Sequence, residues 1–150
     1  MDMLPQRRRL HHSVPSWVET NPLFFVTFCT LPRGRNQLCQ PAIGPALLES
    51  CVIYHQAHRW WVRIFLLMPD HVHALVAMPK EESLETRIRL WKSYQTKNHG
   101  ISWQTGFFEH RLRSCESQSQ KIEYIRMNPV RAGLVARPED WPYVWQPTDI

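Results

Sequence analysis

The sequence predicts an α+β fold in which helices pack on an antiparallel sheet. Short apolar segments of strand-like composition alternate with longer segments of helical spacing, and two of the strand-like segments are joined by a tight turn. With 150 residues and 43% hydrophobic content, the chain can build one core and no more. We therefore expect a single domain over residues 15–150, preceded by a basic arm over residues 1–14.

The first half of the domain contains a strand, a helix and a hairpin. Leu23 to Cys29 is expected to be a strand, and Ala46 to His58 has helical spacing. Trp60 to Leu67 and His71 to Met78 are rich in residues typical of strands, and Pro69 occupies the second position of the turn between them. These two segments should pair as an antiparallel hairpin.

The second half is expected to contain a helix, a short strand and a last helix. Ser83 is placed to cap a helix that runs through Lys97, and Phe107 to Leu112 should be a short strand. Ser117 opens a capping box for a helix that ends at Asn128, where the following proline stops it.

Charge and cysteine usage limit the partners and the compartment. The formal net charge is +5 and the pI is about 9.3, which favours polyanionic partners such as nucleic acid. The four cysteines show no paired spacing, so we expect reduced thiols and no disulfides. No apolar run is long enough to span a membrane, and we expect a cytoplasmic protein, at most associated with the nucleoid, without a membrane partner.

Two histidines at the start of the second hairpin strand are the first candidate site. His71 and His73 are separated by one residue, so on a strand both side chains point to the same face, as a pair of metal ligands requires. Val72, Ala74 and Val76 alternate with them and should form the core side. The alternative is that the imidazoles are ordinary polar residues of a half-exposed sheet.

The last helix contributes a second candidate group. Tyr124 and Asn128 are four residues apart and should share a helix face. A neutral phenol is a poor nucleophile without a nearby cation, whereas an amide oxygen suits Mg²⁺ or Mn²⁺. A packed tyrosine and an ordinary helix terminator remain the alternatives, and Tyr94 with Asn98 has the same spacing.

A zinc site is a competing hypothesis. Cys51, His55 and His58 recur at helical spacing and could bind zinc from one helix face. A structural zinc site normally has a fourth ligand, which this segment lacks, and histidines near a helix C-terminus also interact favourably with the helix dipole.

Five stretches of the chain form a recognisable set of motifs: Met68–His73, Trp103–Gln104 with Gly106–Phe108, His110–Arg113, Tyr124–Ile125 and Asn128–Val135. Together these motifs resemble the REP-associated tyrosine transposases, single-tyrosine members of the HUH class of transposases and nucleases. The resemblance covers roughly residues 15–145, and the motif that follows the tyrosine is its most specific part.

The resemblance implies a ferredoxin-like or RRM-like fold and an enzyme that cleaves and rejoins single-stranded DNA at hairpin-forming palindromic repeats. His71, His73 and Asn128 match positions of the metal ligands, with Mg²⁺ or Mn²⁺ as cofactor, and Tyr124 matches the nucleophile that forms a 5′-phosphotyrosine. It further implies a monomer.

The DNA contacts are expected from basic and aromatic residues. Arg111 and Arg113 should share one face of a short strand and are the first candidates, with His110 on the other face. Base stacking is a role for Trp103 and Trp141. Further candidates are Lys92, Lys97, Arg131 and, in the arm, Arg7, Arg8, Arg9, His11 and His12.

Two other functions use the same fold. A non-catalytic module could bind single-stranded or hairpin nucleic acid without turnover. A metal-dependent hydrolase that activates water would not need Tyr124, whereas a transposase would lose its activity in Tyr124→Phe.

Overall fold

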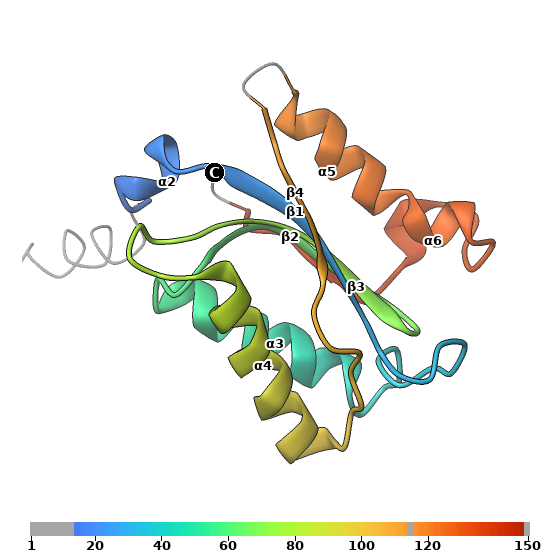
Figure 1. The fold of residues 1–150 in the computed structure, drawn as a ribbon. Coiled ribbons are helices and arrows are strands. Elements are labelled where there is room, and N and C mark those ends of the chain that lie inside the picture. The colour runs from blue at the N-terminus through green and yellow to red at the C-terminus, as the bar shows by residue number, and fades with distance from the viewer. Residues whose placement is uncertain (1–13, 114–115, 149–150) are drawn as a thin grey trace, which may run out of the picture.

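The computed structural model describes residues 14–113 and 116–148, and its centre is an antiparallel sheet with the strand order β4-β1-β3-β2-β5 (Figure 1). The strands are β1 (Leu23–Cys29), β2 (Trp61–Met68), β3 (His71–Ala77), β4 (Phe108–Arg111) and β5 (Val144–Trp145). The helices are α2 (Trp17–Thr20), α3 (Gly44–Gln56), α4 (Leu84–His99), α5 (Gln118–Arg126) and α6 (Asn128–Arg131), followed by the 3-10 turn η1 (Pro138–Asp140).

The order of elements from β1 to β4 identifies the architecture. The chain runs β1-α3-β2-β3-α4-β4, and these four strands lie in the order β4-β1-β3-β2. This is the ferredoxin-like arrangement, an α+β fold, as predicted. The chain then adds α5 and α6 after β4 and places β5 along the free edge of β2.

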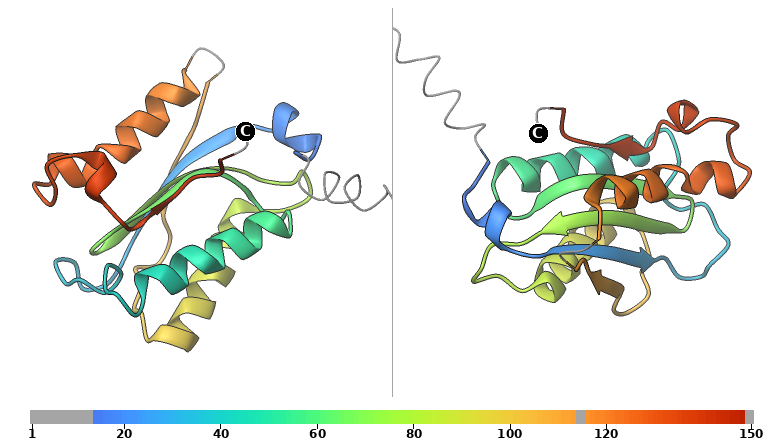
Figure 2. Two further views of the ribbon diagram at one scale, coloured as in Figure 1. Left: turned by 180° about the vertical axis from the view of Figure 1, so that it is seen from behind. Right: turned by 90° about the horizontal axis from the view of Figure 1, so that it is seen from above.

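Helices cover both faces of the sheet, which creates two cores where the composition predicted one. On one face α3 and α4 pack side by side, and on the other lie α5 and α6 (Figures 1 and 2). Val72, Ala74 and Val76 belong to the first core, as predicted. Leu75, on the histidine face, is also fully buried because it packs with Ile125 of α5 and its neighbours in the second core. The histidine face is therefore partly covered.

Local sequence signals fix the element ends where the prediction placed them. The Ser83 hydroxyl accepts a hydrogen bond from the Thr86 N–H, and Ser117 accepts one from the Gln120 N–H. Each bond satisfies one of the amides that the first turn of a helix leaves without an intrahelical acceptor. Gly100 ends α4 with a φ of 69°, a left-handed conformation that glycine adopts without steric cost.

The last predicted helix is divided into two. α5 ends at Arg126, and α6 starts at Asn128 with Pro129 in its first turn, so the helix does not run continuously to Asn128. Pro129 opens a new turn rather than stopping the chain, since a proline fits the first helical turn. The side chain of Arg131 donates to the carbonyl of Tyr124, which compensates for the interrupted helical ladder.

Three elements were not predicted. α2 lies in a segment for which no element was predicted, and η1 and β5 lie in the C-terminal tail. The tail extends the sheet, because Val144 pairs with Leu66 and Trp145 with Phe65. No helix among the described residues is long and apolar enough to cross a membrane. The arm residues 1–13, with the five candidates for DNA contact, lie outside the described residues.

Candidate active site

The two histidines lie together on β3, on the sheet face below α5. The register pairs His73 with Thr27 of β1 and with Leu66 of β2, while His71 pairs with Cys29 and Met68. The imidazole centroids are 4.7 Å apart, with the rings nearly perpendicular. Two adjacent ligand-type side chains therefore face the same side, as the alternation in sequence predicted.

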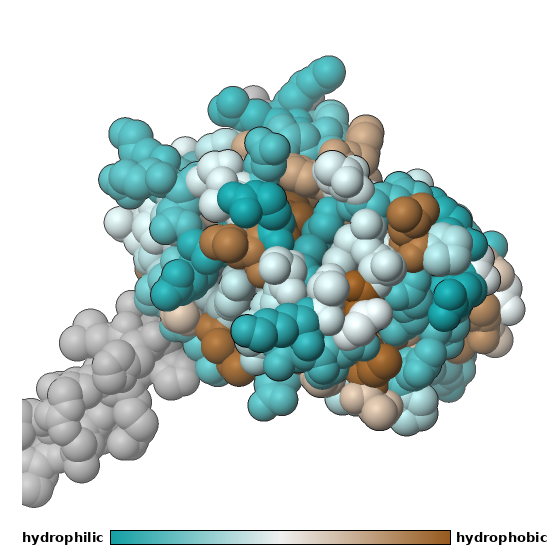
Figure 3. Space-filling view, turned by 60° about the horizontal axis from the view of Figure 1, so that its bottom comes forward, coloured by the Kyte–Doolittle hydropathy of each residue, from teal (hydrophilic) through white to brown (hydrophobic). Residues whose placement is uncertain are grey.

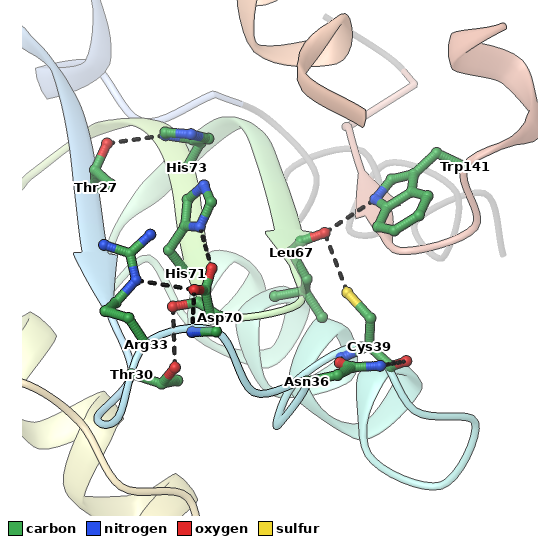
Figure 4. A network of polar contacts seen from close by, with 11 residues as sticks. Thr27, Thr30, Arg33, Asn36, Cys39, Leu67, Asp70, His71, His73 and Trp141 are labelled. Carbon is green, nitrogen blue, oxygen red and sulfur yellow. Dashed lines mark hydrogen bonds and ion pairs between the residues drawn. The ribbon is translucent and has the colours of Figure 1, made fainter. Parts of the chain in front are cut away.

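Hydrogen bonds orient both imidazoles through the same ring atom (Figure 4). His71 Nδ1 lies 2.8 Å from Asp70 Oδ1, and His73 Nδ1 lies 2.8 Å from the hydroxyl of Thr27. The Asp70 carboxylate can only accept, so Nδ1 of His71 carries the hydrogen, which leaves Nε2 as the nitrogen that could bind a metal in the neutral ring. A carboxylate behind a histidine is the usual arrangement when the far nitrogen binds a metal.

Asp70 is itself held from the loop after β1. The guanidinium of Arg33 (Nε, 2.9 Å) and the N–H of Gly34 (2.8 Å) both donate to Oδ2 of Asp70. Burial alone would raise the pKa of Asp70, but the hydrogen bonds from Arg33, His71 and Gly34 outweigh it and hold the pKa well below its usual range. The carboxylate therefore stays charged and available to His71.

The environment of His73 favours the neutral imidazole. Burial, followed by the nearby charges of His71 and Arg131, lowers the pKa of His73 to about 3. A neutral ring is the form that binds a metal ion.

Phe25 connects the histidines to the tyrosine. The ring of Phe25 stacks on His73 at a centroid distance of 5.7 Å and meets the ring of Tyr124 edge to face at 6.5 Å. Tyr124 comes from α5 and His73 from β3, and Ile125, next to the tyrosine, is buried between α5 and the sheet. The fold thus brings these two predicted site residues onto one aromatic side chain.

Two cations lie over the Tyr124 ring. The guanidinium carbon of Arg131 is 4.2 Å from the ring centroid and Lys121 Nζ is 5.5 Å from it, while Lys121 is also 5.1 Å from the centroid of Phe25. Tyr124 is 52% exposed, so its ring is accessible to a large ligand. Positive charge beside an accessible phenol can attract a phosphate and stabilise a developing phenolate.

The donor set fits a divalent cation only if ligands other than His, Cys, Asp and Glu complete it. No three side chains of those four types converge on a possible metal position within residues 14–113 and 116–148. Asn128, at the start of α6, uses its Nδ2 to donate to the Ile125 carbonyl at 3.3 Å, an interaction that leaves its amide oxygen uninvolved. Two imidazoles and an amide oxygen leave positions for phosphate oxygens and water.

The candidate DNA residues of β4 divide between the two faces, as the alternation predicted. His110 pairs with Phe25, which places it on the histidine face, whereas Arg111 pairs with Phe24 on the opposite face. His110 Nε2 is 3.1 Å from the carboxylate of Glu116, which also accepts the N–H of Arg113. Arg111 and Arg113 are both exposed at this edge of the sheet.

The candidates on α4 lie away from the histidine face. Lys92 is buried, and its ammonium donates to the carbonyls of Gln104 and Gly106 at 2.9 Å each, so it anchors that loop instead of meeting solvent. Lys97 and Tyr94 are exposed on α4, across the sheet from His71 and His73. Of the two tyrosines with an asparagine four residues later, only Tyr124 is therefore beside the histidines.

The two candidate stacking tryptophans are packed. Trp103 contacts Phe28 and Trp91 at centroid distances of 5.6 Å and 5.9 Å, in the core under α4. Trp141 donates its indole N–H to the carbonyl of Leu67 at 2.9 Å (Figure 4). Both rings contribute to the packing of the fold.

The structure does not support the zinc hypothesis. Cys51 is fully buried in the first core, where burial raises the pKa of its thiol. His55 Nδ1 accepts the N–H of Val62 at 3.0 Å, and the centroid of its ring lies 4.0 Å from that of Trp61 in a tilted contact. Cys51 and His55 therefore take part in packing and in the start of β2.

Four site residues were not found from the sequence: Thr27, Arg33, Lys121 and, above all, Phe25. Thr27 and Phe25 alternate with buried residues of β1, so the alternation that located the strand could have placed them on the histidine face. Lys121 lies three residues before Tyr124, a helical neighbour position. Arg33 offers no comparable signal, because its contact with Asp70 spans 37 positions of loop and strand.

No protein-family model matches the chain. A REP-associated tyrosine transposase of Escherichia coli is 29% identical in an alignment of 85 residues, with 55% of this chain and 52% of the relative covered. A provisionally named REP-associated tyrosine transposase of Haemophilus influenzae is 30% identical in an alignment of 95 residues, with 51% of this chain and 53% of the relative covered. The sequence is homologous to REP-associated tyrosine transposases. The matched region spans about half the length of these curated relatives.

Solved structures share the fold. The structure of a REP-associated tyrosine transposase bound to a REP hairpin superposes with a TM-score of 0.71 at 24% identity, covering 83% of this chain and 76% of the other. A provisionally assigned transposase of Deinococcus radiodurans gives a TM-score of 0.52 at 14% identity, covering 76% and 92%. These likenesses support the ferredoxin-like assignment.

Proposed function

We propose that this protein is a single-stranded DNA endonuclease and strand transferase, a transposase-type enzyme in which Tyr124 is the nucleophile. The observation that carries the proposal is that Phe25 contacts both His73 and Tyr124. The homology to REP-associated tyrosine transposases supports the same role. An enzyme of this kind needs a nucleophile and a phosphate-activating group on one surface, and these side chains come from elements far apart in sequence.

The covalent step is an in-line displacement at a phosphodiester. The Tyr124 oxygen forms a bond to phosphorus while the bond from phosphorus to the 3′ oxygen breaks, which gives a 5′-phosphotyrosine and a 3′-hydroxyl. The phenol releases its proton to solvent and the departing oxygen takes one up. Because the phosphodiester is conserved in the tyrosine linkage, a 3′-hydroxyl can reverse the step and rejoin the strand without a nucleotide cofactor.

The side chains around Tyr124 supply position and charge. Arg131 and Lys121 would hold the scissile phosphate near the phenol and stabilise negative charge as it develops. Phe25 fixes the separation between the tyrosine and the histidine face. Since orientation can supply about 7 kcal/mol or more of a barrier, this positioning is a large part of what the protein contributes.

His71, His73 and Asn128 would hold a divalent cation, Mg²⁺ or Mn²⁺, which polarises a phosphate oxygen. Asp70 and Thr27 orient the two imidazoles for that purpose. The substrate we propose is single-stranded DNA next to a hairpin, since one structural neighbour is bound to a REP hairpin. We propose that the protein acts as a monomer in the cytoplasm.

The test is a covalent adduct assay with a labelled library of hairpin-bearing single strands, in the presence of Mn²⁺ or Mg²⁺. A labelled band that migrates with the protein on a denaturing gel reports the phosphotyrosine. We expect Tyr124→Phe and His71→Ala to abolish the band. Tyr94→Phe and His99→Ala are matched controls on α4 and should leave it unchanged.

Each other outcome supports a different function. Cleavage that survives Tyr124→Phe would show that water is the nucleophile and would refute the strand-transfer mechanism. Binding of the same strands without cleavage or adduct, at any divalent cation tested, would favour the non-catalytic binding module.

A further inference from the structure

One pocket is lined by residues of α2 and by Gln118, the first residue of α5. It has a volume of about 520 Å³ and its lining is predominantly polar. Three arginines, Arg63, Arg111 and Arg113, line it together with Glu19, Glu116 and Gln118. Glu116 is already engaged by the Arg113 N–H and by His110, so the arginines are the groups available to an incoming ligand.

Arg63 is the unusual member of this set. It is the only charged residue of β2, whose other seven residues are apolar and buried. The register of β2 on β3 shifts between Val62 and Ile64, so Arg63 occupies a β-bulge. Bulges re-aim a side chain and gather near functional sites.

The Nε–H of Arg63 lacks a hydrogen-bond acceptor within the described residues, and this nitrogen is buried. None of the ion pairs in that part of the chain involves Arg63. Arg63 is half-buried, and burial lowers the pKa of its guanidinium, so an anion in the pocket would offset part of the cost of holding this charge away from water.

The pocket shares a lining residue with a smaller pocket beside Tyr124. A smaller pocket of about 380 Å³ is lined by Tyr124, Lys121 and Glu116, and Glu116 lines both pockets. Gln118, at the start of α5, lies six residues before Tyr124, which corresponds to about 9 Å along a helix axis. A single strand of DNA that passes Tyr124 can therefore follow α5 to the arginines.

We propose that Arg63, Arg111 and Arg113 form a phosphate-binding pocket that holds the backbone of the DNA strand beyond the scissile phosphate. The identification of the ligand as DNA rests on the proposed function, whereas the binding of an anion rests on the arginines that line the pocket. A guanidinium fork is suited to phosphate oxygens, and two exposed arginines beside a half-buried one combine attraction with a fixed direction. The contact is to phosphate, so it does not read sequence.

The test measures binding of a fluorescein-labelled oligothymidine by anisotropy over a range of salt concentrations. We expect Arg63→Met to weaken binding about tenfold, as loss of one charge-assisted contact requires. The slope of log K against log salt should become shallower by about 0.7 for each phosphate contact removed. Arg111→Gln, a change at an exposed residue that cannot disturb the core, should act in the same direction. Arg89→Gln, at an exposed arginine of α4, is the matched control and should change neither the affinity nor the salt slope.

Thermal unfolding of Arg63→Met separates binding from folding. Methionine keeps the length of the side chain without the unpaired charge, so the variant should be at least as stable as the parent. Unchanged affinity and salt slope in both Arg63→Met and Arg111→Gln would overturn the pocket.

Failure of the pocket is distinguishable from failure of the proposed function. At saturating DNA, Arg63→Met should still form the Tyr124 adduct. If no adduct forms with any strand while binding depends on Arg63, the pocket stands and the strand-transfer function falls. If the adduct forms and binding is unchanged in both Arg63→Met and Arg111→Gln, the strand-transfer function stands and the pocket falls.

Discussion

Replacing Phe25 with leucine should slow adduct formation in a protein that still folds. The ring of Phe25 makes three aromatic contacts, with His73, Tyr124 and Phe108, at centroid distances of 5.7, 6.5 and 6.3 Å. Such pairs contribute about 0.5 to 1.5 kcal/mol each beyond area burial, so Phe25→Leu should cost about 2 kcal/mol of unfolding free energy. In a domain of this size that lowers the melting temperature by about 4 to 8 °C.

The neighbouring residue provides the control. Phe24 lies on the same strand with similar exposure, but it packs into the core below α3 and α4. Phe24→Leu should cost about 1 kcal/mol through lost volume alone. The assay is covalent adduct formed per minute at a temperature where circular dichroism shows both variants folded.

We expect Phe25→Leu to form adduct about a hundredfold more slowly than the parent, because displacement of reacting groups by about 1 Å can have that effect. Phe24→Leu should retain the parental rate. Equal rates in the two variants, with both folded, would refute the argument that Phe25 sets the position of Tyr124 relative to the histidine face.

Three further predictions concern the residues around this surface. Asp70→Asn removes the carboxylate that orients His71 and should weaken Mn²⁺ binding about 10-fold to 100-fold in calorimetric titration, whereas Asp140→Asn, in the exposed ion pair with Arg137, should have no effect. Lys92→Met leaves the Gln104 and Gly106 carbonyls without their donor and should cost about 1 to 3 kcal/mol in urea unfolding; unaltered stability would contradict the anchoring role, and Lys97→Met is the exposed control. Burial raises the pKa of the Cys39 thiol to about 12, so it stays protonated in the folded protein where an unfolded thiol ionises. Stability from this thiol is complete below about pH 8.5 and is lost as the pH rises toward 12, which chemical denaturation across that range can measure; the difference between the parent and Cys39→Ala isolates it, because the Cys51 thiol, whose pKa burial also raises, is present in both proteins.

The alternation of apolar residues was enough to place four of the five strands of the sheet. Leu23–Cys29 is a strand with the predicted bounds, and the hairpin turn at Pro69 is where it was expected. These signals are local, because each depends on period and turn chemistry within a few residues. The two-residue strand at Val144 and Trp145 has no period to detect, and it exists only because β2, nearly eighty residues earlier, offers a free edge.

The roles of the basic residues at the site could not be predicted from local sequence in the same way. The histidine pair was visible because both members lie on one strand, two residues apart. A lysine on an amphipathic helix gives no comparable signal: Lys92 and Lys121 look alike in sequence, yet one is buried against two carbonyls and the other lies over Phe25 and Tyr124. Their difference arises from which face of the sheet each helix covers.

The two faces of the sheet have different roles: one mainly stabilises the fold, and the other carries the candidate site. The face below α3 and α4 is closed by large buried rings such as Phe28, Phe65 and Trp91, and its outer surface is mainly hydrophilic with separate apolar patches (Figure 3). The other face has a smaller core, centred on Ile64 and Ile125, which fixes α5 but ends before Tyr124. Beyond that core the side chains become polar or half-exposed. A change in the first core should therefore alter stability before chemistry, and a change at the rim of the second should do the opposite.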